Sequence, residues 1–543
     1  MSTTSLPTTS NDAPPAPPVL DIEHMPVTDD PRAWSNFRKN VILFLVSSAS
    51  MIAGLASNIQ NPAIGDMERD LPATSSQISL SLSLFIAFQG SMPLLWTALS
   101  EIKGRKLVYV SSIAIFVAAS AVVATSKTIA LVIVFRVIQA TGSSAVMAVG
   151  ELKVGRRYEF LMLIGAATLA DIFEPAERGT KMGIYYIAPL LGPSLAPIMG
   201  GVLTTAWNWR APFWFLTVVS GLSLVGMVFF FKDTFRKERS LTYQAVLRTR
   251  LAEAQEKARK SESKAASRAV SIAEKPDARV SPPTTPGTNT PLPPDVEKQE
   301  PKVAALPTLK LSLRDVNPIT PLWIVMRRLN NIVILFASGL IFAFNFVVVY
   351  SASRELEGRY GYNALETGFV LLSFGIGNLA GSLLGGRYSD RKLAQLKAAN
   401  GGVGYPEMRL HSTTIGLILL PPSVVGFAWV TQERVHVAAM CVFLFLSGFF
   451  VIWAYTSTLA YIVDANKGRS STAVAANSCF RGIGAFAFTE IAVPLQNAVG
   501  DGWQYTIWAV LLAIVGLLVW LVAKKGGKWR EAAELREQAS QNQ

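Results

Sequence analysis

Three ionisable side chains lie inside stretches of the sequence that are otherwise apolar. Arg136 lies within residues 128–150, and Arg481 and Glu490 lie within residues 471–499. A charged group in such a stretch is costly and usually faces a cavity or a partner, so these residues are candidates for carrying a proton or coupling charge to movement. Arg481 and Glu490 are nine residues apart, about 13 Å along a helix and about 180° around it, so we do not expect them to pair. Glu490 fits either a proton site or a carboxylate at a helix end.

Two short polar loops place an acid before a group of basic residues, once in each half of the chain. The first loop runs from Thr97 to Lys106 and the second from Gly386 to Lys392. A carboxylate at the end of one helix can pair with arginines of its neighbours, and such a charge lock holds one conformation until it is neutralised. The alternative is a turn whose positive charges only set topology, and the repetition favours the lock. The predicted gating and coupling residues are Glu101, Gly104, Arg105, Lys106, Arg136, Asp390, Arg391 and Glu490.

Polar and aromatic residues on apolar faces predict a binding cavity. Hydrogen bonding between helices, or aromatic packing, is an alternative explanation for any one of them. Together they describe a cavity with amides, aromatics and little fixed charge, which suits amphipathic or weakly charged organic molecules. The predicted cavity residues are Asn58, Gln60, Gln89, Asn345, Asn378, Trp453, Tyr455 and Arg481.

The composition indicates which elements must position these residues. Half of the 543 residues are hydrophobic and only 16% are charged, and the mean hydropathy is +0.35. A soluble protein of this length rarely has such a composition, so we predict an all-α polytopic membrane protein. The net charge of +13 comes from loops between apolar stretches, where lysine and arginine set topology, so it does not indicate nucleic-acid binding. Neither a disulfide framework nor a metal-ligand cluster is predicted from the two cysteines and three histidines.

Twelve apolar stretches, each near the 20 residues needed to cross a bilayer, form two groups of six. The first group is 41–61, 78–99, 107–125, 128–150, 181–203 and 211–231, and the second is 332–352, 365–386, 412–430, 436–462, 471–499 and 503–523. The loops on one side hold twelve basic residues and those on the other hold six, which predicts cytosolic N- and C-termini. The predicted domains are a disordered cytosolic tail (1–40), a six-helix bundle (41–231), a cytosolic linker (232–330), a second six-helix bundle (331–523) and a cytosolic tail (524–543).

The fifth apolar stretch combines small residues with prolines. Ala188, Gly192, Ala196 and Gly200 recur every four residues, and Pro189, Pro193 and Pro197 follow the same step one position later. Such a face allows close helix packing, and the prolines allow a hinge. The eighth stretch has a similar row, Gly377, Gly381 and Gly385. The predicted hinge and packing residues are Gly192, Pro193, Gly200, Gly201, Gly377 and Gly381.

Residues 151–165 interrupt the pattern, with five charges directly after the fourth stretch. Without them, the fourth stretch would continue smoothly into Ala166 and the residues that follow. Codons for Gly150-Glu-Leu152 can contain a splice donor, and codons for Ile164-Gly165 can contain an acceptor. We therefore hypothesise a retained in-frame intron of 15 codons; the alternative is a genuine loop insertion. Sequencing the transcript across codons 145–170 distinguishes the two.

Several motifs together resemble a known family. They are the loop Leu99-Ser-Glu-Ile-Lys-Gly-Arg-Lys106, Arg136-Val-Ile-Gln139, Gly192-Pro193, Gly200-Gly201 and Trp209-Arg210. They resemble the signature stretches of the major facilitator superfamily, and more narrowly those of fungal drug:proton antiporters with twelve spans, over about residues 41–525. The chain departs from the loop motif, with Thr97 in place of a glycine, Glu101 in place of an aspartate and Ile102 in place of an arginine, so its charge lock has fewer charges.

The resemblance implies a major facilitator fold of two six-helix bundles, with the fifth and eighth spans facing each other between them. We expect the two glycine rows to pack against each other there, so that the bundles can rock. We also expect a bulky residue at Gly192 to block cycling without preventing insertion.

The resemblance also implies export of organic small molecules, such as drugs or metabolites, in exchange for protons. An uptake symporter on the same fold and a transporter-like nutrient sensor that signals through the linker are the alternatives, and no enzymatic motif is present. We expect a monomer of the plasma membrane that contacts the lipid bilayer, its substrate and protons, uses a proton gradient without a cofactor, and binds no nucleic acid.

Overall fold

The computed structural model describes residues 27, 29–146, 168–169, 171–236, 250, 256, 259–260, 319–466 and 469–541. The chain divides into two units, residues 31–235 with 312–543 and residues 1–30 with 236–311. Within the described part of the smaller unit, Arg236 forms an ion pair with Asp29 at 3.3 Å. The apolar helices belong to the larger unit, which is the subject of the following paragraphs. The hypothetical intron at 151–165 and most of the predicted linker lie outside the described residues.

Six apolar helical spans make up the first half of the larger unit. They are α1 (Asn36–Asn58), α3 (Ser75–Ser91) followed by α4 (Pro93–Lys103), α5 (Arg105–Thr125), α6 (Ile129–Ser144), α8 (Pro175–Ala206) and α9 (Ala211–Phe230). Three short elements accompany them, namely η1 (Pro31–Ala33), η2 (Asn61–Ala63) and α2 (Ile64–Asp70). Proline separates α3 from α4, whereas the three prolines of α8 lie inside one continuous helix.

The second half contains the remaining spans. They are α12 (Leu329–Gly358), α13 (Ala364–Ala399), α14 (Thr414–Gln432), α15 (Val437–Ala465) and α16 (Ser470–Gln541), with α11 (Ile319–Arg327) and η4 (Pro406–Thr413) as shorter elements. The range of α16 contains two helices, because Gly500 between them has φ 76° and is not helical. A capping box begins the second span of each half, formed by Thr74 with Gln77 at the start of α3 and by Asn363 with Glu366 at the start of α13.

The predicted number of spans agrees with the helices. Ten helical ranges among the described residues are long and apolar enough to cross a membrane. One of these ranges holds the two helices separated by Gly500, and the apolar helix Ile129–Ser144 is shorter. The described part of the chain therefore has twelve apolar helices in the predicted order.

Several helices extend into segments for which the sequence predicts a tail or a linker. Helix α1 begins at Asn36, and α11 lies before the predicted end of the linker. The last helix continues to Gln541 and is held by ion pairs of Glu537 with Arg328 and Arg469, at 2.9 Å and 2.8 Å. Sequence hydropathy marks only the apolar part of a long helix and does not distinguish a helix as short as α11, so these segments are not predicted as helical.

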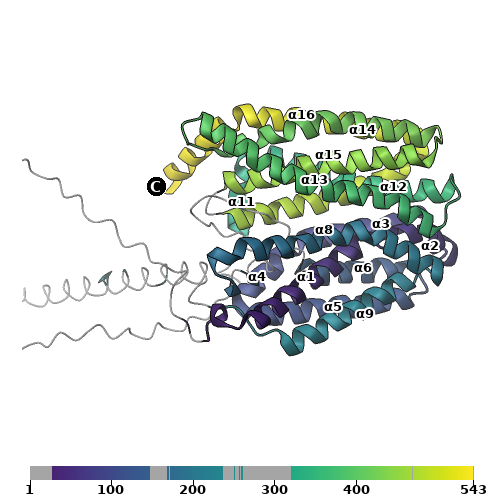
Figure 1. Ribbon diagram of the computed structural model, residues 1–543, viewed down its shortest axis with the longest axis horizontal. Coiled ribbons are helices and arrows are strands. Elements are labelled where there is room, and N and C mark those ends of the chain that lie inside the picture. Colours follow the sequence, from purple (N-terminus) through teal and green to yellow (C-terminus); the bar gives the residue numbers. More distant parts are fainter. Residues whose placement is uncertain are drawn as a thin grey trace, which may run out of the picture. The chain divides into compact units, whose positions relative to one another are not determined.

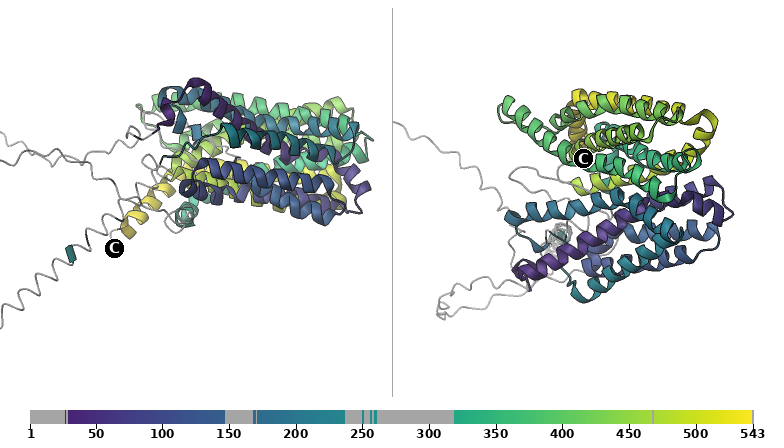
Figure 2. Two further views of the ribbon diagram at one scale, coloured as in Figure 1. Left: turned by 90° about the horizontal axis from the view of Figure 1, so that it is seen from below. Right: turned by 45° about the vertical axis from the view of Figure 1, so that its right-hand side comes forward.

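The two halves form two bundles of roughly parallel helices that lie side by side (Figures 1 and 2). Helix α8 runs along α13 and α3 runs along α16 at the boundary between the bundles. The second bundle has its own buried core, whereas one core of the first bundle also takes in Phe346, Tyr350, Ala485 and Val493 from the second. The boundary is thus a packed interface that can position side chains from both halves.

Candidate functional site

The first predicted charge lock forms around the buried Arg105. Its Nη2 lies 2.9 Å from Oε1 of Glu101, and its Nε lies 3.6 Å from Oδ2 of Asp171. Its backbone N–H donates to Oδ1 of Asp233 at 3.0 Å. Among the described residues, Arg105 is the arginine that pairs with Glu101. Arg105 belongs to the same loop as Glu101, and the neighbouring segments supply the acids Asp171 and Asp233, which the sequence reasoning missed.

Gly104 and Lys106 flank this cluster. Gly104 has φ +90°, and a Cβ atom there would lie 2.0 Å from Oδ2 of Asp233, so both the backbone conformation and the space require glycine. The Lys106 ammonium donates to the carbonyl oxygen of Val228 at 2.9 Å. The described partners of this loop therefore all belong to the first bundle.

The second predicted lock centres on Arg409, which lies in η4. Arg409 Nη1 is 3.3 Å from Oδ1 of Asp390, and its Nε also binds Asp464 of α15. Here an acid at the end of one helix does pair with an arginine of a neighbouring element, as predicted. The predicted Arg391 is exposed. The sequence reasoning treated Arg409 only as a topogenic charge and missed Asp464.

Arg136 is fully buried inside the first bundle. Its Nη1 donates to Oε1 of Gln139 at 2.7 Å and to the carbonyl oxygen of Ala56 at 3.1 Å. Its Cζ lies 3.9 Å from the ring centroid of Phe85 and 5.7 Å from that of Phe213. Nε and Nη2 have no hydrogen-bond partner among the described residues. Arg136 is thus a buried cation stabilised by an amide, a carbonyl and two rings.

Several predicted cavity residues bind within a single bundle. Asn58 Oδ1 accepts from Asn61, Gln60 Nε2 donates to Ser81, Gln89 Nε2 donates to the Ala53 carbonyl and to Ser143, and Trp453 Nε1 donates to the Ser412 carbonyl. These four predicted residues are all at least nine-tenths buried. For them the structure favours the alternative role, hydrogen bonding between neighbouring segments.

Other predicted cavity residues come together in the second bundle. Asn345 of α12 donates to Asn378 of α13 at 3.4 Å. Arg481 of α16 donates to the hydroxyl of Tyr455 of α15, and its Cζ lies 4.0 Å from the ring centroid of Phe342 of α12. Unlike Arg136, both Asn345 and Arg481 are partly exposed. Within this group, Asn345, Asn378 and Arg481 keep some exposed surface.

Glu490 bridges the two bundles. Its Oε1 accepts from the hydroxyls of Ser83 at 2.6 Å and Ser79 at 3.2 Å, both on α3. As predicted, Glu490 does not pair with Arg481. The serines were missed, although their spacing of four residues places both on one face of a helix.

The predicted packing of the two glycine rows against each other is wrong. A Cβ at Gly192 would lie 2.5 Å from the carbonyl oxygen of Met51, so this row of α8 packs on α1. At Gly200 the nearest atom is the Ile59 carbonyl oxygen, at 2.1 Å. The row of α13 faces α15, because a Cβ at Gly377 would lie 2.3 Å from the carbonyl oxygen of Phe445.

Helices α8 and α13 do face each other as expected, but through other residues. A Cβ at Gly375 would lie 2.9 Å from Cα of Ser194, and one at Gly368 would lie 2.6 Å from the Pro197 carbonyl oxygen. A Cβ at the predicted Gly201 would lie 2.4 Å from the carbonyl oxygen of Ala364. Gly381 and Pro193 remain inside their bundles, with Gly381 against Phe449 and Pro193 against Gly54. Small residues therefore line both the interface between the bundles and the contacts within each bundle.

Hydrogen bonds and ion pairs between the described parts of the bundles are confined to one portion of the interface. These contacts begin at the end of the bundles opposite the start of α1. They reach as far as Ser91 and Ser194, near the middle of the helices. They involve Gly65, Arg69, Ser75, Ser79, Ser83, Ser91, Ser194 and Thr205 of the first bundle, with Tyr350, Glu357, Leu365, Gly375, Cys479, Thr489 and Glu490 of the second. The two charge clusters lie at the opposite end, and their described ion-pair partners come from their own bundles. The bundles are thus tied at the end away from the termini.

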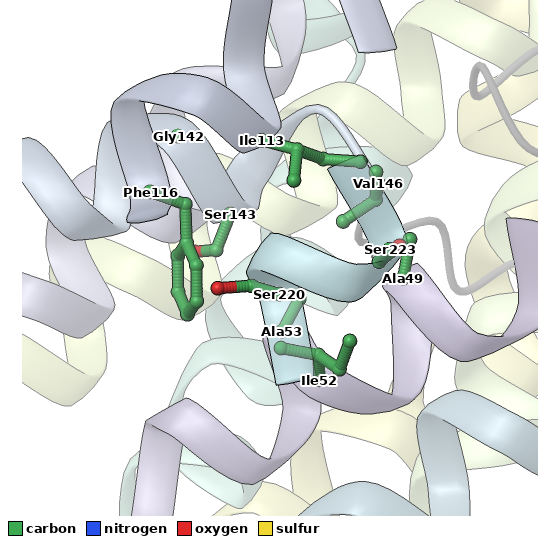
Figure 3. A pocket seen from close by; sticks show the side chains of 10 residues that line it. All are labelled: Ala49, Ile52, Ala53, Ile113, Phe116, Gly142, Ser143, Val146, Ser220 and Ser223. Carbon is green, nitrogen blue, oxygen red and sulfur yellow. The ribbon is translucent and has the colours of Figure 1, made fainter. Parts of the chain in front are cut away.

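A small cavity inside the first bundle does not belong to this interface (Figure 3). It measures about 10 Å³ and is lined by Ala49, Ile52, Ala53, Ile113, Phe116, Gly142, Ser143, Val146, Ser220 and Ser223. This volume holds at most one water molecule. The cavity is too small for an organic substrate.

The comparison with known families decides the identity of the fold. A family model described as Major Facilitator Superfamily matches residues 46–489. The chain belongs to the major facilitator superfamily. It is an integral, multi-pass membrane protein and, as a member of this family, a transporter rather than an enzyme.

Curated fungal relatives align with most of this superfamily member. "MFS antiporter QDR3" of Candida albicans is 27% identical over 93% of this chain and 80% of its own length. "Quinidine resistance protein 3" of Saccharomyces cerevisiae is 23% identical over 94% and 86%. "Citrate exporter 1" of Aspergillus niger is 23% identical over 94% and 90%. The resemblance to fungal antiporters that the motifs predict is confirmed.

Proposed function

We propose that this protein exports small organic molecules in exchange for protons, by alternating access between its two bundles. The observation that carries the proposal is the uneven interface, in which the hydrogen bonds and ion pairs between the described parts of the bundles lie at the end away from the termini. With the termini in the cytosol, such an arrangement suits a state that receives cargo from the cytosol. Opening the tied end and closing the other would complete the cycle.

Glu490 is the proposed proton-coupling group. Its carboxylate accepts hydrogen bonds from Ser79 and Ser83 of the other bundle, so its surroundings change whenever the bundles separate. A carboxylate accepts two hydroxyl protons better than a carboxylic acid does, and therefore the deprotonated form holds this end closed. Protonation weakens the connection, which links proton binding to the movement.

The names of the relatives support export but leave the cargo open. One is called an antiporter, another an exporter, and their names mention quinidine and citrate. We place the protein in the plasma membrane, as a monomer that contacts the bilayer, its organic substrate and protons. In this proposal the proton gradient is the energy source, and neither a cofactor nor nucleic acid takes part.

Reconstituted liposomes test the proposal. Their lumen, at alkaline pH, holds an equimolar mixture of small aromatic and aliphatic carboxylates, the corresponding amides and the corresponding amines, and the outside medium is made acidic. Liposomes with the protein should release some of these compounds faster than protein-free liposomes. In Glu490→Gln the pH gradient should no longer accelerate release of the compounds. Exchange of the same compounds across the membrane without a gradient should continue.

The other outcomes identify the alternatives. If outside acidity drives compounds into the lumen, the protein is an uptake symporter. Binding of a compound without flux would indicate a sensor. Proton-driven release that is unchanged in Glu490→Gln would leave export standing but assign coupling to another residue.

A further inference from the structure

The partly exposed guanidinium of Arg481 lies in an aromatic setting in the second bundle. Its Cζ is 4.0 Å from the ring centroid of Phe342 and 5.4 Å from that of Tyr455. The ring of Phe342 also lies 5.0 Å from that of Phe346, between centroids. Three helices, α12, α15 and α16, therefore surround this cation with apolar and aromatic surface.

No acid among the described residues forms an ion pair with Arg481. The other carboxylate of the same stretch, Glu490, is bound to serines of α3. Arg105, Arg328 and Arg409, near the ends of spans, each pair with at least one carboxylate, whereas Arg136, which lies inside a span, binds an amide and a carbonyl among the described residues. An arginine near the middle of a membrane helix usually has a partner, because an isolated charge is costly there. Arg481 lacks one in this state.

Among the described residues, Arg481 donates to one acceptor, the hydroxyl oxygen of Tyr455, and the nearby Oδ1 of Asn477 has no hydrogen-bond partner. Arginine only donates, and the same hydroxyl oxygen also accepts from Nδ2 of Asn477 at 3.4 Å. The Nε of Arg481 has no acceptor among the described residues. The Tyr455 hydroxyl proton can be donated as well. A group with several acceptor atoms and a negative charge would satisfy these donors.

We infer that Arg481 and Tyr455 form a binding subsite for an anionic group, and that the cargo is an organic anion such as a carboxylate with an apolar or aromatic body. This inference rests on the proposed function, since it names the substrate class of the same transport path. The guanidinium lies over the ring of Phe342, and a planar guanidinium can bind a carboxylate through two N–H groups once the carboxylate reaches it. The rings of Phe342 and Tyr455 provide apolar surface for the rest of the molecule. The fixed positive charge disfavours organic cations at this position.

The same liposomes and mixture test the inference. We expect the wild-type protein to release the carboxylates faster than protein-free liposomes do, with a preference for the aromatic ones, while the matched amides and amines leave no faster than from protein-free liposomes. Arg481→Gln should slow carboxylate release by about tenfold or more, since a charge-assisted hydrogen bond is lost. Arg481→Lys keeps the positive charge but not the planar guanidinium. Its rate of carboxylate release should therefore lie between those of the wild type and Arg481→Gln. Tyr455→Phe should weaken release less than Arg481→Gln does.

A matched surface variant and the choice of compounds separate the possible results. Arg434→Gln removes an exposed arginine far along the chain from this group and should release carboxylates as the wild type does. Release of amines or amides without carboxylates would overturn the anion subsite while supporting export. Carboxylate release that is unchanged in a folded Arg481→Gln or Arg481→Lys protein would also overturn it. If the wild type released nothing, the proposed transport function itself would fail.

Discussion

Arg136 shows how a single cation can be buried in a membrane bundle without an acid among the described residues. Its charge is stabilised by hydrogen bonds to the Gln139 amide and the Ala56 carbonyl and by the ring faces of Phe85 and Phe213. Cation–π contacts strengthen when they are shielded from water, so the two rings replace part of the missing hydration. Arginine suits this position better than lysine, because its planar group can stack and donate at the same time.

Gln139→Leu tests this account of Arg136. The change removes the best-placed acceptor of a buried guanidinium and should lower the free energy of unfolding by about 2 kcal/mol. The thermal midpoint of the purified protein in detergent should fall by several degrees. Gln139→Glu is the control, because it restores an acceptor with the opposite charge and should bring the midpoint back to the wild-type value or above. A wild-type midpoint in Gln139→Leu would show that the amide is not needed.

Asp171 gives a prediction that depends on pH. Burial raises the pKa of its carboxyl from the usual 3.8 to about 6, although the neighbouring Arg105 lowers it; Glu101 and Asp233 raise it further, and a hydrogen bond from Thr234 lowers it. The folded protein therefore retains a proton that the unfolded chain has lost. The contribution of Asp171 to stability is greatest below about pH 4 and is lost as the pH rises to about 6.

Asp171→Asn should remove this part of the pH dependence. The measurement is the thermal midpoint at a series of pH values, taken as the difference between wild type and variant. Relative to Asp171→Asn, the wild type should lose stability as the pH rises from about 4 to about 6 and change little above that. A constant difference across this range would contradict the raised pKa.

At the scale of whole elements, the sequence predicted the spans well but not the partners of their faces. Apolar length alone identifies a membrane helix, and the spacing of small residues correctly marked two smooth faces. A face of small residues can pack against any other such face, however. In the structure the row of α8 packs against α1 near Gly54, and the row of α13 packs against α15 near Phe445. The sequence does not reveal the acids near Arg105 for a related reason. Asp171 and Asp233 are distant from Arg105 in the sequence, and the fold brings them to it.

Two glycines of similar chemistry should therefore behave differently when changed to alanine. Gly192→Ala forces apart α8 and α1 within one bundle, so the thermal midpoint should fall by several degrees. Gly368→Ala places a methyl group against α8 of the other bundle and should slow transport more than it lowers the midpoint. Each variant serves as the control for the other. Equal effects of the two on the midpoint would contradict the assignment of these contacts.

At the scale of the molecule, the two bundles must separate where they are now tied. Helices α3 and α16 approach each other closely, since a Cβ at Gly90 would lie 2.6 Å from the Ser478 carbonyl oxygen. The native Cys479 lies beside this contact on α16. Its Sγ is 3.8 Å from Oγ of Ser91 on α3. A single substitution can therefore introduce a cross-link between the bundles.

Ser91→Cys should form a disulfide with Cys479 under mild oxidation, because the two side chains are already close enough for small adjustments to bring the sulfurs together. If the bundles separate here during each cycle, oxidation should abolish transport and a reducing agent should restore it. The double variant with Cys479→Ser is the matched control and should be insensitive to oxidation, as should the wild type, whose other cysteine is Cys441. If protein that mass spectrometry shows to be cross-linked still transports at the full rate, α3 and α16 stay together throughout the cycle. Rocking of the two bundles would then be the wrong description of how this transporter moves its cargo.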